Sequence, residues 1–81
     1  MKNTFAILHN QLLENYHFSN ANNPERKSLN FQNLKRGFQN LFFVAQYTGD
    51  VEAAQELVVH CAGLVTGDIP EPLEVGSVAN A

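Results

Sequence analysis

The sequence of 81 residues is poor in the features that mark several common classes of protein. It has one cysteine, which excludes an internal disulfide and therefore a disulfide-stabilised secreted domain. Its first apolar run, residues 5–8, is too short for a signal peptide, and no run approaches the length of a membrane span. We therefore expect a cytoplasmic protein that does not enter a membrane.

Charge is also scarce, because only 16% of the residues are Asp, Glu, Lys or Arg, and the formal net charge is −3. Domains that bind nucleic acid through its phosphates are usually basic overall, so this balance argues against nucleic acid as a partner. All five basic residues precede residue 37, and six of the eight acids follow residue 49. Two halves that fold against each other, or copies that pair head to tail, would account for this asymmetry.

Hydrophobic residues, in contrast, are plentiful, since they make up 44% of the chain and include six phenylalanines. A domain of this size buries only about 60–65% of the surface that its unfolded chain exposes. So many apolar residues with so little interior require either a very well packed core or a partner that covers part of the surface.

Three segments have the apolar periodicity of helices, and proline interrupts none of them. The first comprises residues 4–16, and the Asn-rich residues 17–23 predict a loop after it. Asn23 as a cap, with Pro24 in the first helical position, predicts a second helix that runs to Tyr47. The apolar stripe of the first helix contains Phe5, Leu8, Leu12 and Tyr16, widened by Ile7 and Leu13.

A third helix is predicted directly after the second. Gly49 can take the left-handed conformation that ends a helix, and Asp50 can cap the next one. Both helices carry apolar residues at spacings of three and four, which is the pattern that an antiparallel helix pair buries. The two stripes are Phe31, Leu34, Phe38, Leu41 and Ala45, and Val51, Ala54, Val58, Cys61 and Val65. The echo of FQNL within FQNLKRGFQNL is thus mostly a packing pattern.

We therefore predict an all-α fold with a short N-terminal helix, a long antiparallel helical hairpin and an extended C-terminal tail. The single helical domain should comprise residues 1–67. Residues 68–81 contain two prolines and three acids. We expect this acidic tail to lie outside the core, extended, and flexible unless it docks.

The stretch YTGDVEAAQELVVHCA, residues 47–62, is similar to one helical hairpin of the tetratricopeptide repeat family. In this resemblance Gly49 and Asp50 form the turn, while Ala54 and Cys61 are the small packing residues. The resemblance implies a helical hairpin and a role in binding proteins. A DNA-binding helix-turn-helix is not indicated, because the helix that would enter the groove opens with acidic residues, which phosphates repel.

Residues for catalysis or metal binding lack useful spacing. The candidate soft ligands are His9, His17, His60 and Cys61, but no C-x-x-C or H-x-x-x-H pair occurs among them. Cys61 lies on an apolar stripe, where a thiol is usually an inert core residue. Paired carboxylates, a phosphate loop and a serine elbow are also missing from the sequence. We therefore expect neither an enzyme nor a bound metal or cofactor.

Four basic residues of the second helix can share one of its sides. They form either a solvated face that keeps an apolar helix soluble or a strip that binds a nucleotide or another small anion. The four are Arg26, Lys27, Lys35 and Arg36. Gly37, which follows them, costs about 1 kcal/mol relative to Ala within a helix. The close approach of another helix, or of a ligand, would account for it.

Apolar residues remain after the stripes are assigned. The run LFFVA, residues 41–45, surrounds most of its helix, and residues 57–59 do the same on the third. We expect a protein partner, or a second copy in a homodimer or higher oligomer, to cover this surplus. The residues expected in that interface are Phe42, Phe43, Leu57 and Val59.

The predicted function is that of a small protein-binding module that serves as a regulator, adaptor or inhibitor in a bacterium or a phage. The alternative is a binder of a nucleotide or small anion through the basic face, a chemistry that would suit an anti-defence protein of a phage or mobile element.

Overall fold

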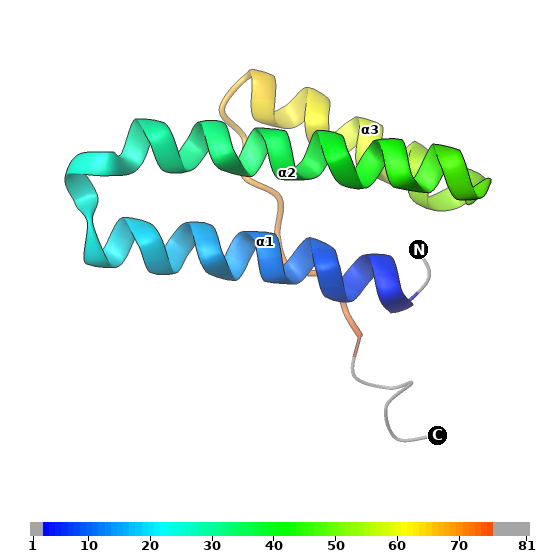
Figure 1. Ribbon diagram of the computed structural model, residues 1–81, viewed down its shortest axis with the longest axis horizontal. Helices are drawn as coiled ribbons and strands as arrows, with labels where there is room; N and C mark the ends of the chain where they lie inside the picture. Colours follow the sequence, from blue (N-terminus) through cyan, green and yellow to red (C-terminus); the bar gives the residue numbers. More distant parts are fainter. Residues whose placement is uncertain (1–2, 76–81) are drawn as a thin grey trace.

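The computed structural model describes residues 3–75, and within that range it contains three α-helices, which confirms the predicted all-α fold. Helix α1 spans Asn3–Asn22, α2 spans Lys27–Thr48 and α3 spans Val51–Val65. A short 3-10 helix, η1, spans Pro24–Arg26. Figure 1 shows α1 and α2 lying side by side and antiparallel, with α3 behind α2. Helix α2 packs against both of the other α-helices and is therefore the central element.

The turn between α2 and α3 forms as the sequence predicts. Gly49 has a left-handed conformation with φ 77°, and its N–H donates to the carbonyl of Gln46 at 3.1 Å. Asp50 caps α3, because its Oδ1 accepts a hydrogen bond from the N–H of Ala53 at 3.1 Å. These two residues let one helix end and the next begin without an intervening loop.

Helix α1 is longer than predicted, because it continues through residues 17–22, which we expected to form a loop. Contacts with α2 hold this extension in place. Within the extension, the side chain of Asn30 donates to Asn20 at 2.9 Å, and just before it the rings of Tyr16 and Phe31 meet edge to face. The predicted cap, Asn23, makes no side-chain capping bond, and α2 begins only after η1.

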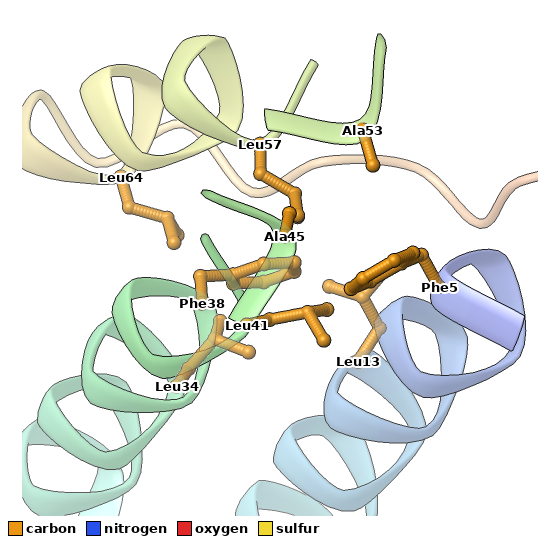
Figure 2. Packing of buried hydrophobic residues seen from close by; sticks show 9 residues of the cluster. All are labelled: Phe5, Leu13, Leu34, Phe38, Leu41, Ala45, Ala53, Leu57 and Leu64. Atoms are coloured by element: carbon orange, nitrogen blue, oxygen red, sulfur yellow. The ribbon is translucent and has the colours of Figure 1, made fainter. Parts of the chain in front are cut away.

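The hydrophobic core lies where the three helices meet. Phe38 of α2 is at its centre and has no exposed surface. Figure 2 shows nine buried side chains that converge from α1, α2 and α3. The predicted stripe of α2 faces this core, since Leu34, Leu41 and Ala45 are buried with Phe38. Gly37 lies against α1, where an added Cβ would be 2.6 Å from Cδ2 of Leu12, so the close approach of another helix does account for this glycine.

The predicted stripes of the other two helices are wrong in part. The buried residues of α3 are Ala53, Leu57 and Leu64. Three residues of the predicted stripe, Val51, Val58 and Val65, are instead 66%, 47% and 74% exposed. In α1 the buried residues are Phe5, Ala6, His9 and Leu13, whereas Ile7 and Leu8 are exposed. Each helix carries more than one apolar stripe, and the packing against α2 selects which of them is buried.

The described part of the tail, residues 68–75, has no helix or strand, and it crosses from the end of α3 to α1 (Figure 1). Ile69 packs against the core. Asn10 of α1 binds the backbone of Leu73 twice, donating from Nδ2 to its carbonyl at 2.7 Å and accepting at Oδ1 from its N–H at 2.8 Å. The tail is therefore docked on α1. The rest of the predicted tail, residues 76–81, lies outside the described residues.

Candidate functional site

An apolar cleft of about 400 Å³ lies between the C-terminal half of α2 and the N-terminal half of α3. The Gly49–Asp50 turn contributes to its wall, which places the cleft at the end of the hairpin. Its lining is mostly apolar with a few polar groups, the composition that is common in binding sites. The lining residues are Phe42, Ala45, Gln46, Gly49, Asp50, Val51, Ala54, Gln55 and Val58.

The outward stripe of α3 forms one side of this cleft. Val51, Ala54 and Val58 line it, and the spacing of three and four places Cys61 and Val65 further along the same side of the helix. An exposed helix face with apolar residues at such intervals is the form that packs against a partner helix. We call this surface the α2–α3 face, and it consists of Phe42, Val51, Ala54, Val58, Cys61 and Val65, with Phe43 at its edge through the ring contact with Phe42.

The four residues predicted to bind a partner occupy different environments. Phe42 lines the cleft, and its ring centre lies 5.8 Å from that of Phe43, which is 60% exposed. Leu57 is completely buried in the core, so its expected place in an interface is wrong. Val59 is 65% exposed, but it does not line the cleft. Phe42 therefore lies on the α2–α3 face and Phe43 at its edge.

Asp50 supplies the acidic group among the residues that line the cleft. One of its carboxylate oxygens caps α3, and the other, Oδ2, is buried without a hydrogen-bond partner among the described residues. A buried polar atom that lacks a partner carries a free-energy cost of about 1–3 kcal/mol.

The basic residues of the alternative anion site lie away from this cleft. Within the described chain, the linings of the cleft and of three openings along α1 do not include Arg26, Lys27, Lys35 or Arg36. Nζ of Lys35 lies 5.6 Å from the centre of the Phe31 ring, so this charge rests on an aromatic face of its own helix.

Comparisons with protein-family models, curated proteins and solved structures find no match for this chain. The turn at Gly49 and Asp50 is present, as the resemblance to a tetratricopeptide hairpin implies. Ala54 and Cys61, its expected small packing residues, are only partly buried at the edge of the core. No helix within residues 3–75 is long and apolar enough to pass through a membrane.

A cluster of polar side chains joins α1 to α3. The spacing of these residues along the chain does not reveal it. His9 is completely buried, and its Nε2 lies 2.9 Å from Nδ1 of His60. The ring of Phe38 meets both imidazoles edge to face, with centres 5.0 Å and 6.3 Å away. One signal could have located His9, because it lies four residues from both Phe5 and Leu13 and therefore shares their helix face.

Burial determines the protonation of this cluster. Burial lowers the pKa of His9, against the smaller opposing effects of the Asn10 hydrogen bond and the negative charge of Glu56. Burial and then the neighbouring His9 lower the pKa of His60. Both imidazoles are therefore neutral at pH 7.

The thiol of Cys61, next along α3, is weakly reactive. Burial raises its pKa, which keeps the sulfur protonated and a poor nucleophile at neutral pH. No three His, Cys, Asp or Glu side chains gather as metal ligands in the described part of the chain.

Proposed function

We propose that this chain is a small non-enzymatic protein-binding module that acts as a regulator, adaptor or inhibitor through the α2–α3 face. The observation that supports this function is the outward apolar stripe of α3 beside the cleft of about 400 Å³. Isolated exposed apolar side chains are common on soluble proteins, whereas a continuous row beside a cleft is typical of an interaction site.

The partner that fits this face is the apolar side of an amphipathic helix. A row of side chains at intervals of three and four interlocks with the same intervals on a facing helix. A second copy of the chain carries such a helix, because its own α3 presents the same stripe. The proposed assembly is therefore a homodimer in which the two α2–α3 faces pack on each other about a twofold axis.

The free energy available on this face is sufficient for a weak dimer. Burying an exposed Phe or Val is worth roughly 1.5–3 kcal/mol. Because these side chains are already 26–53% buried, two copies of Phe43, Val51, Val58 and Val65 contribute about 7–15 kcal/mol by this measure. Association itself costs about 4–15 kcal/mol. We therefore expect dissociation in the micromolar range rather than a permanent dimer.

Two variants at neighbouring positions test whether this face, rather than another side of α3, forms the interface. Val58→Asp places a charge in the cleft, whereas Val59→Asp places the same charge on an exposed position outside it. Sedimentation velocity of the wild type and both variants across the micromolar range measures the assembly. The expected result is a dimer for the wild type and for Val59→Asp, and a monomer for Val58→Asp.

Equal behaviour of the two variants would contradict the choice of the α2–α3 face. A wild type that remains monomeric throughout would exclude the homodimer. Affinity capture from the native cell with the same pair of variants then tests the broader proposal. A partner retained by Val59→Asp and lost by Val58→Asp is the result that this function requires.

A further inference from the structure

The cluster around His9 contains hydrogen bonds whose directions can be assigned. Nδ2 of Asn10 donates to the carbonyl of Leu73, so Oδ1 of Asn10 is an acceptor. His9, whose Nδ1 lies 3.0 Å from that oxygen, must therefore carry its hydrogen on Nδ1. Its Nε2 is then an acceptor, and the hydrogen bond of 2.9 Å from His60 is donated by Nδ1–H of His60. One chain of hydrogen bonds thus links helix α3 to helix α1 and α1 to the tail.

This chain of bonds tolerates one added proton but not two. His60 can accept the first proton at its Nε2 and still donate from Nδ1. A second proton must go to Nε2 of His9, because that is the unprotonated nitrogen of this ring, and there it replaces the hydrogen bond that Nε2 accepts from His60. Two N–H donors with two positive charges would then face each other across 2.9 Å. The pair cannot remain in contact in that state.

The tail depends on the two helices that this pair joins. It leaves α3 after Val65 and is fixed to α1 at Asn10, so it spans the seam between them. On its way it packs Ile69 against the core. Its Pro72 lies beside Asn10 and Leu13 of α1 along an opening of about 560 Å³. Movement of α1 away from α3 would pull the tail from one of its two attachments.

We propose that residues 68–75 are a latch that acid opens: a second proton on the His9–His60 pair separates α1 from α3 and releases Leu73 from Asn10. Release would uncover the surface of α1 beside Leu13 and free the carboxamide of Asn10 to bind another extended backbone. This inference does not depend on the proposed function, because the latch and the α2–α3 face use different surfaces.

The groups that face the pair agree with this behaviour. From α3, the negative charge of Glu56 favours a proton on either ring, which assists the first protonation. From α2, the neighbour is the uncharged ring of Phe38. From α1, the neighbour is the neutral side chain of Asn10. The tail contacts Asn10 through the backbone of Leu73, and the acids on either side of Leu73, Glu71 and Glu74, are exposed.

The sign of the pH effect follows from the direction of the two pKa shifts. Folding holds the pKa of both histidines below that of an unfolded histidine, about 6.5. The unfolded chain, or an opened one, therefore binds more protons than the closed form as the pH falls. The stability of the closed latch is complete above about pH 7 and decreases as the pH falls through and below about 6.5.

The latch can be followed through the amide of Leu73 by NMR hydrogen exchange on the full chain. After correction for the intrinsic pH dependence of exchange, protection of this amide should fall at least about tenfold between about pH 7 and pH 5, while the helical circular dichroism is retained. His60→Asn keeps a donor near the position of Nδ1 and cannot be protonated, so its Leu73 amide should stay protected. His17→Gln, at an exposed histidine, should respond as the wild type does.

Two further measurements complete the test. Asn10→Ala should leave the Leu73 amide unprotected at both pH values, because it removes the attachment itself. If His60→Asn does not fold, the wild-type imidazole titrations decide the matter, since protection must disappear together with the second proton uptake of the pair. Leu73 protection that is independent of pH, or that is lost equally in His60→Asn, would overturn the proposal.

Discussion

Replacing Phe38 by alanine tests the centre of the fold. This side chain has no exposed surface and touches the rings of both His9 and His60, so its loss leaves a cavity between the three helices. Phe→Ala in a core costs about 3–5 kcal/mol. A domain of this size has a free energy of unfolding of only about 4–12 kcal/mol. The variant should therefore be barely folded or unfolded at room temperature.

The same helix provides a matched control. Phe43 is on α2 as well, but it is exposed, so Phe43→Ala should change the free energy of unfolding by no more than about 0.5 kcal/mol. Urea unfolding followed by circular dichroism measures both variants at pH 7, at concentrations low enough to keep the chain monomeric. A loss below about 1 kcal/mol for Phe38→Ala, or a larger loss for Phe43→Ala, would refute the packing described above.

Three further predictions concern the turn and the tail. Gly49→Ala places a side chain on a left-handed residue, and urea unfolding should show a loss of about 1–2 kcal/mol; a neutral effect would mean that the turn takes another conformation. Asp50→Ala should cost about 0.5–2 kcal/mol through the lost cap. Asp50→Ser keeps a cap without the buried unpaired oxygen, so it should be at least as stable as the wild type, and equal losses in both variants would contradict the capping role. Truncation after Gly67 removes Ile69 and the Leu73 bonds and should lower the melting temperature, whereas an unchanged value would show that the tail contributes no stability.

The sequence predicted the elements of the fold better than it predicted the helix faces. On α2, the polar residues Gln32, Asn33, Gln39 and Asn40 surround the stripe of Leu34 and Phe38, so one buried face was clear. On α3, by contrast, Ala53 and Leu57 compete with the equally apolar Val51 and Val58. Periodicity alone cannot choose between two such stripes, because the choice depends on packing against another helix.

The candidate site was predicted only in part for a related reason. Of the residues expected on an apolar surface, Phe42 lines the cleft and Phe43 is exposed beside it, whereas Leu57 was assigned to the surface by the same error of helix face. The pairing of His9 with His60 brings together residues that are 51 positions apart, and no local pattern encodes such a contact. The extension of α1 was missed because contacts between Asn20 and Asn30 overcame the loop preference of an Asn-rich segment.

The attachment of Leu73 to Asn10 has a kinetic consequence. The α1–α2 and α2–α3 pairs are joined by short connections, so their contacts are local and can form early. The tail must instead close a loop between Asn10 and Leu73, which are 63 residues apart. The entropy cost of closing this loop becomes small only after the helices have docked, because docking brings the two ends of the loop together. The three helices should therefore assemble first and the tail last. In the folded protein the order reverses, so the tail should be the first segment to detach in spontaneous fluctuations that leave the helices intact.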